Sequence, residues 1–328
     1  MIDALRLETA RPGPDVGILD DSFARCIRDG LGRTPKDIAC KFFYDATGSA
    51  LFDAICALPE YYQTRTEVAL LRRHAGEIAA LIGADAEIVE FGAGALRKVR
   101  ILLEALQAPR GYTPIDISGA YLRGVVRQLA ADYPGLALTP VVGDFTLPLQ
   151  LPVLPGTPAR RVGFFPGSTI GNFRPDAAMA LLRRMRDMLG GGGLLVGVDL
   201  IKDPALLHAA YNDAAGVTAA FNKNLLARAN RELGADFNLD AFAHYAPYNP
   251  KAQRIEMYLV SLKRQSVRLS PALGGVVEFA AGEAVHTEDS HKYSIESFRE
   301  IAAHAGFSPR AVWCDEARLF SIHWLESR

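Results

Sequence analysis

The chain has 328 residues, of which 49% are hydrophobic and 22% charged, so it is long enough to bury one large core or two smaller ones. Its 36 basic and 37 acidic residues are interspersed and give a net charge of −1, which excludes the strong overall field that attracts nucleic acid or an acidic membrane. A small ligand that is recognised locally is the better expectation.

The cysteines and histidines lack the spacing of metal sites. Four cysteines show neither a CxxC pair nor a compact framework, which disfavours structural zinc and a secreted disulfide scaffold, and seven histidines form no HxH or HExxH pattern. The first residues lack a basic segment followed by an apolar one, and no apolar run approaches the ~18 residues of a membrane span. We expect a cytoplasmic monomer without a metal and without a nucleic-acid or membrane partner.

The first regular elements predict a strand between two helices. Apolar residues recur at helical spacing over residues 66–82, and Gly83 ends this helix. The apolar strand EIVEF (87–91) follows, runs into the turn Gly92-Ala93-Gly94, and leads to a helical pattern over 97–106.

The same unit then repeats. Strands are predicted over 111–117, 136–142 and 161–165, at intervals suited to helical crossovers. A helix over 176–189, which four glycines end, leads to a fifth buried strand over 194–200. This order predicts an α/β fold with a doubly wound, Rossmann-like sheet.

The pattern changes after residue 200, because residues 202–239 form a long helical stretch without strand signals. Strand-like segments at 254–260 and 276–280 follow, and the tail resembles a last helix and strands that return to the sheet. An aromatic cluster before residue 62 is predicted to pack on this second part; it comprises Phe42, Phe43, Tyr44 and Phe52. The predicted boundaries are 62–201 plus 291–328 for the sheet domain and 10–61 plus 202–290 for a smaller α+β domain.

The glycine turn lies at the carboxyl end of a strand, where an open parallel sheet binds ligands and glycine lets a cofactor approach the backbone. A nicotinamide fingerprint needs a third glycine where this chain has Arg97, and no GxxxxGK[ST] phosphate loop occurs in the sequence. Dinucleotides and nucleoside triphosphates are therefore disfavoured. A purely structural turn is the alternative.

Acidic residues follow the next two predicted strands. Asp116, about 20 positions after the glycines, is placed to accept hydrogen bonds from ribose hydroxyls. Asp144 could receive an adenine amino group, and the neighbouring ring of Phe145 could cover the adenine face. Each residue alone is a weak signal, but their order on successive strands favours an S-adenosylmethionine-dependent methyltransferase.

Two segments are candidates for the substrate. PGSTIGNF (166–173) follows the fourth strand, where the transferable group of such a cofactor would point, and Asn172 could bind an amino acid or simply cap the next helix. TEDS (287–290) follows a strand, and in extended backbone Glu288 and Ser290 point to the same side and could hold a nitrogen heterocycle. A solvated acidic turn is the alternative there.

At this point the sequence resembles the histidine-specific methyltransferase family of ergothioneine biosynthesis, from about residue 41 to residue 293. The resemblance rests on long strings in the same order: KFFYDATGSALFDAI, LPEYYQTRTE, EFGAGALRKVRILLEAL, PIDIS, GDF, PGSTIGNF, AYNDAAGVTAAFNKNLLARANRELGADF, RIEMYL and GEAVHTEDSHKY. One departure is EFGAGALRK, where the best-known members look more like ELGSGTSEK; the lysine and both glycines are kept, but the difference indicates a separate branch.

The resemblance implies which residues bind the two ligands. It places S-adenosylmethionine against Gly92, Lys98, Asp116, Asp144 and Phe145, of which Lys98 is not predictable from spacing. It places L-histidine among Tyr61, Gly167, Asn172, Tyr211, Glu288 and Ser290, with Asn172 and Tyr211 on the carboxylate and Glu288 and Ser290 on the imidazole. The expected reaction is trimethylation of the α-amine, giving hercynine.

Methyl transfer needs alignment of nitrogen, carbon and sulfur more than a nucleophile on the protein. We expect Tyr44 to orient the amine while water accepts its proton, although a tyrosine in an aromatic cluster is more often core. Three alternative functions stay open. The first is the same chemistry on tryptophan or another amino acid, and it depends on how Glu288, Ser290 and Met257 shape the pocket. The others are a nicotinamide dehydrogenase, which Arg97 disfavours, and a non-catalytic amino-acid sensor.

Overall fold

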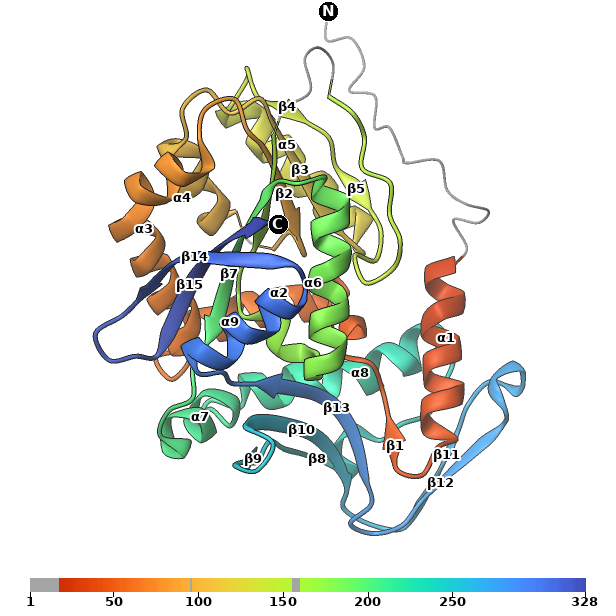
Figure 1. Ribbon diagram of the computed structural model, residues 1–328. Helices are drawn as coiled ribbons and strands as arrows, with labels where there is room; N and C mark the ends of the chain where they lie inside the picture. The colour runs from red at the N-terminus through yellow and green to blue at the C-terminus, as the bar shows by residue number, and fades with distance from the viewer. Residues whose placement is uncertain (1–17, 95, 155–159) are drawn as a thin grey trace, which may run out of the picture. The chain divides into compact units, whose positions relative to one another are not determined.

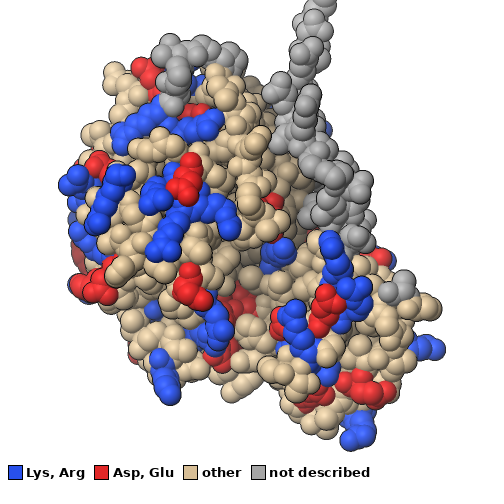
Figure 2. Space-filling view, turned by 45° about the vertical axis from the view of Figure 1, so that its right-hand side comes forward, with Lys and Arg blue, Asp and Glu red and all other residues tan. Residues whose placement is uncertain are grey.

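A computed structural model describes residues 18–94, 96–154 and 160–328 (Figure 1). Among these residues the chain forms two compact units, one of residues 63–201 and 292–328 and the other of residues 18–62 and 202–291. The predicted start of the smaller domain at residue 10 lies outside the described residues. Acidic side chains lie among the basic ones on the face that Figure 2 shows.

The first unit is built on an eight-stranded mixed sheet with the order β14-β15-β7-β6-β2-β3-β4, and β5 also pairs with β3. The strands from β7 to β3 are parallel, whereas β15 is antiparallel to both of its neighbours. Their bounds are β2 (Glu87–Phe91), β3 (Gly111–Asp116), β4 (Ala137–Leu138), β5 (Val141–Val142), β6 (Arg161–Phe165), β7 (Gly193–Asp199), β14 (Phe307–Cys314) and β15 (Phe320–Ser327). The predicted α/β sheet is confirmed.

Helices cover both faces of this sheet. Successive residues of a strand point to opposite faces, so the buried residues of one strand belong to two different cores. Ile88 of β2 packs with Val99 and Leu129 in one core, and its neighbour Val89 packs with Leu182 and Phe298 in the other. The helices are α3 (Tyr62–Ile82), α4 (Arg97–Ala105) and α5 (Gly119–Asp132) on the first face, and α6 (Pro175–Leu189) and α9 (Ile295–His304) on the second.

The second unit contains a smaller sheet in the order β1-β13-β10-β8, with β9 paired to β10, and a separate pair β11-β12. The strands are β1 (Lys36–Asp37), β8 (Phe242–Tyr245), β9 (Tyr248–Asn249), β10 (Arg254–Ser261), β11 (Gln265–Arg268), β12 (Val276–Phe279) and β13 (Ala284–His291). The helices are α1 (Ile18–Leu31), α2 (Ala46–Ala57), α7 (Pro204–Tyr211) and α8 (Val217–Leu233).

The aromatic cluster packs on α8, as predicted. Phe43 stacks on the ring of Phe221 with 4.5 Å between centroids, and the rings of Tyr44 and Phe52 lie 5.7 and 6.0 Å from the same ring. The order of elements therefore brings the segment before residue 62 together with the helices that follow residue 202.

The solvated-turn alternative for residues 287–290 is wrong, whereas the extended backbone expected there is present. The segment 287–290 does not follow a strand as a solvated turn but lies inside β13, which pairs with β10 along most of its length. Glu288 and Ser290 are buried as a result. Alternation between apolar and polar residues is absent here, so the period-2 signal that marks a strand did not reveal it.

Candidate active site

The glycine turn after β2 is held by the neighbouring strand. The N–H groups of Gly92 and Ala93 both donate to the carbonyl of Ile115, at 2.9 and 3.0 Å. Gly92 has a φ of +78°, which L side chains rarely adopt, and a Cβ there would lie 3.5 Å from the ring of Phe145. Glycine at this position therefore keeps the backbone open beside an aromatic ring.

The two predicted carboxylates lie at or just after the carboxyl ends of β3 and β5. Asp116, at the end of β3, accepts a hydrogen bond from the N–H of Ser118 at 2.7 Å, and burial raises the pKa of its carboxyl to about 6. Asp144 accepts from the N–H of Thr146 at 2.8 Å, and the ring of Phe145 packs edge-on against Phe165. The carboxyl ends of the parallel strands β2, β3 and β5 thus present Gly92, Asp116, Asp144 and Phe145 at one edge of the sheet.

Lys98, on the first turn of α4, forms an ion pair with Glu67 of α3, with 2.5 Å between Nζ and Oε2. The two carboxylate oxygens of Glu67 also accept from the N–H of Gly167, at 2.9 and 3.0 Å. Glu67 is only 1% exposed. Sequence reasoning missed this residue, because a glutamate within a helix gives no signal of what it contacts.

The loop after β6 is fixed at several points. Gly167 and Ser168 have φ values of +80° and +56°, and the Ser168 hydroxyl accepts from the N–H of Asp199 at 2.9 Å. Asn172 ends the short 3-10 helix η2 (Thr169–Asn172). It does not cap α6, because the N-cap residue of that helix is Arg174. The capping alternative for Asn172 is therefore wrong.

A β-bulge decides which side chains of β13 face the buried side. The register with β10 shifts by one residue between Met257 and Tyr258, so that Thr287 is the additional residue of β13. Glu288 and Ser290 consequently share a face with Met257, and the Ser290 hydroxyl lies 2.6 Å from the hydroxyl of Tyr211. These residues are brought together within the second unit.

Tyr61 belongs to the same cluster. Burial raises the pKa of its phenol well above the ordinary 10, and the nearby Tyr211, Tyr44 and Glu288 raise it further. Tyr61 therefore stays a protonated hydrogen-bond donor at neutral pH. Tyr44, the predicted catalytic residue, also contacts the ring of Phe52 edge-on at 5.6 Å.

A second buried carboxyl near the glycine turn was also missed. Glu90 of β2 is 3% exposed and accepts a hydrogen bond from the phenol of Tyr112. Burial raises the pKa of Glu90 to about 8, against the opposing effects of Tyr112 and Lys98. The carboxyl is therefore protonated at neutral pH.

A family model of histidine-specific, S-adenosylmethionine-dependent methyltransferases matches residues 23–327. The chain belongs to this family. This methyltransferase is similar to the histidine N-alpha-methyltransferase of Mycolicibacterium smegmatis, with 45% identity over 307 residues that cover 92% of the chain and 94% of the relative. S-adenosylmethionine is its methyl donor.

Two fungal relatives are more distant. The ergothioneine biosynthesis protein 1 of Neurospora crassa is 29% identical over 85% of this chain, which spans 32% of that protein. A 4-dimethylallyltryptophan N-methyltransferase of Epichloe festucae var. lolii is 27% identical over 90% of this chain and 92% of its own length. The methyltransferase thus resembles proteins that are named for two different amino-acid substrates.

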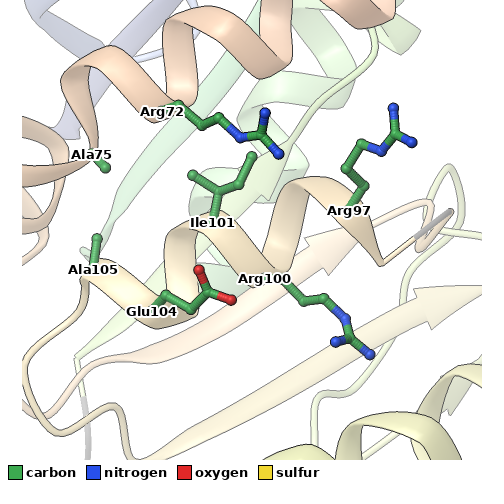
Figure 3. Close-up of a pocket in the computed structure, with 7 residues that line it drawn as sticks. All are labelled: Arg72, Ala75, Arg97, Arg100, Ile101, Glu104 and Ala105. Carbon is green, nitrogen blue, oxygen red and sulfur yellow. The ribbon is translucent and has the colours of Figure 1, made fainter.

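Other features of the described residues do not add a site to this methyltransferase. A surface pocket of about 450 Å³ lies in the first unit and is lined by residues of α3 and α4. Figure 3 shows that Arg97 and Arg100 point in different directions there. None of the residues assigned to the cofactor lines it. Within the described part of the chain, no cluster of His, Cys, Asp and Glu could hold a metal, and no helix is long and apolar enough to cross a membrane.

Proposed function

We propose that this methyltransferase acts on free L-histidine and transfers three methyl groups to its α-amine, giving hercynine for ergothioneine biosynthesis. The names of the relatives from M. smegmatis and N. crassa support the substrate and the pathway. The observation that carries the proposal is the buried pair of Glu288 and Ser290 on one face of β13. A carboxylate and a hydroxyl match the two nitrogens of an imidazole.

The first unit binds the cofactor in this proposal. S-adenosylmethionine supplies a methyl group activated by a sulfonium. Asp116 accepts hydrogen bonds from the ribose hydroxyls, Asp144 receives the adenine amino group, and Phe145 covers the adenine ring. The open backbone at Gly92 supports this placement of the cofactor. Lys98 supports it too, because its ammonium has three N–H donors and can donate to the cofactor's carboxylate as well as to Glu67.

The second unit serves as the substrate-binding domain. Glu288 and Ser290 hold the imidazole, while Tyr211, which already contacts Ser290, and Asn172 bind the carboxylate. Tyr61 donates a hydrogen bond to the same molecule, since its raised pKa keeps it protonated. A side chain without ring nitrogens could not make the hydrogen bonds that an imidazole makes to Glu288 and Ser290, which is a strong basis for discrimination.

The protein's part in catalysis is positional. The α-amine must be neutral before each attack, and Tyr44 orients its lone pair while water accepts the proton. Gly167, Ser168 and Gly171 keep their loop small, which leaves room as the amine gains methyl groups. Repeated transfer to one nitrogen follows from that room.

The test is a panel of all common amino acids incubated with S-adenosylmethionine and followed by mass spectrometry. We expect a gain of three methylene units on histidine, and Glu288→Ala should relax this preference by ~10³-fold while it leaves cofactor affinity intact. If Glu288→Ala kept the wild-type preference for histidine, Glu288 would not be the residue that recognises the imidazole. A second candidate, methylation of a tryptophan derivative, is favoured by the relative from E. festucae and would give the mass gain on an indole instead.

A further inference from the structure

The side chain of Glu67 joins two segments that are assigned to different ligands. Its carboxylate reaches Lys98 of α4, which is assigned to the cofactor, and the N–H of Gly167, in the loop where the transferred methyl group is expected. The Lys98 side chain is 17% exposed, whereas that of Glu67 is 1% exposed. Of the described side chains, Glu67 is the one that forms an ion pair with Lys98.

The fold is shaped around this carboxylate. A Cβ on Gly197 of β7 would lie 2.1 Å from Glu67 Oε1, so a glycine is needed there to leave space. A Cβ on Gly167 would lie 3.4 Å from Lys98 Nζ and would be strained at a φ of +80°. A charge buried this deeply is tolerated only when it is paired and hydrogen-bonded, and Glu67 is both.

The charge of this pair matters because the cofactor is itself a cation. The Lys98 ammonium lies beside Gly167, at the loop where the sulfonium is expected, and two cations in a site of low dielectric repel each other. With Glu67 ionised, the pair is neutral as a whole. Lys98 can then offer hydrogen bonds to a carboxylate without opposing the sulfonium.

We propose that Glu67 is a positioning residue of the methyl-transfer site: it orients Lys98 and the Gly167 turn, and it cancels the Lys98 charge that would otherwise oppose a sulfonium. This inference rests on the proposed function only in that the cofactor meets Lys98. It does not depend on which amino acid is methylated.

The test compares two ligands that differ in the sulfonium charge, S-adenosylmethionine and S-adenosylhomocysteine, by calorimetry on the full chain. Glu67→Gln keeps the shape and an oxygen for Gly167 but removes the charge, so the ratio of the two dissociation constants should shift against S-adenosylmethionine by about fivefold or more. The turnover number should fall in the same variant, by about tenfold, because the reacting groups are aligned less well.

Glu87→Gln is the matched control. Glu87 is an equally buried carboxylate of the same unit, 2% exposed and paired with Arg161, but it lies at the opposite end of β2 from the glycine turn. Its variant should leave the ligand ratio unchanged. A merely structural role for Glu67 would weaken both ligands equally in Glu67→Gln, and that result would overturn the proposal.

A double variant keeps the test decisive if Glu67→Gln is poorly folded. Glu67→Gln combined with Lys98→Gln removes both charges of the pair, which costs less stability than removing one, and should restore the wild-type ligand ratio. A ratio that stays shifted in the double variant would refute the role of charge. Failure of the wild type to bind S-adenosylmethionine would instead refute the cofactor assignment, and binding without methylation of histidine would refute only the substrate.

Discussion

Glu90 provides a direct test of how burial sets protonation beside the glycine turn. Its carboxyl has a pKa of about 8 in the folded chain against an ordinary value of 4.5, mainly because burial disfavours the charged form. The folded state therefore holds a proton that the unfolded state releases above pH 4.5. The stabilisation is fully present below pH 4.5 and is lost as the pH rises towards 8.

The perturbation is Glu90→Gln, which keeps the shape and an acceptor for Tyr112 but cannot ionise. The stability difference between wild type and variant isolates Glu90, because all other titrating groups are common to both. With the two pKa values above, the difference should grow in favour of the variant by about 2.5 kcal/mol between pH 5 and pH 7.

Urea unfolding followed by tryptophan fluorescence suits this measurement. The chain has two tryptophans, Trp313 and Trp324, and both lie in the first unit and pack in the same core as Ile88 of β2. The signal therefore reports the unit that contains Glu90. A difference that stays constant from pH 5 to pH 7 would mean that Glu90 is ionised in the folded chain and that the reasoning is wrong.

Two further predictions concern charges in the same unit. Lys292→Met should lower the free energy of unfolding by about 3–5 kcal/mol in the same urea assay, because it leaves a buried charge unpaired: the side chains of Lys292 and Asp199 are fully buried, with 2.8 Å between Nζ and Oδ2. Adding Asp199→Leu removes that charge and should recover most of the lost stability. S-adenosylmethionine should bind about tenfold more weakly at pH 5 than at pH 8, because the Asp116 carboxyl has a pKa of about 6 and accepts from both ribose hydroxyls best when it is ionised. Calorimetry on Asp116→Asn should show the loss of this tenfold contribution.

The regular part of the fold was predictable because each element carries a local signal. The strand Glu87–Phe91 and the strand Arg161–Phe165 were predicted with their observed bounds, since short apolar runs end in glycine or proline there. Gly92, Asp116 and Asp144 follow successive strands in the sequence. Because parallel strands present their carboxyl ends at one edge of a sheet, their shared edge was predictable as well. These predictions depend on local sequence signals and need no knowledge of contacts between residues far apart in the chain.

The remaining residues depend on tertiary contacts that sequence spacing does not encode. Glu67 contacts Gly167, 100 positions away, and nothing within α3 distinguishes it from a surface glutamate. The bulge at Thr287 is set by pairing with β10, and without it Asp289 rather than Glu288 would share the face of Val285. Resemblance to a family supplied Lys98 and favoured a binding role for Glu288 over a solvated turn, but it did not supply the carboxylate that holds Lys98.

The charges near the glycine turn also explain why two buried carboxyls can lie close to a single lysine. Glu67 is paired with Lys98, and Glu90 keeps its proton, so the pair and the acid add no net charge before the cofactor binds. The proximity of Lys98 lowers the pKa of Glu90, while those of Asp116 and Glu67 raise it. With the cofactor placed as proposed, a bound sulfonium adds another cation and should favour the ionised form of Glu90 further. We therefore expect cofactor binding and proton release from Glu90 to promote each other.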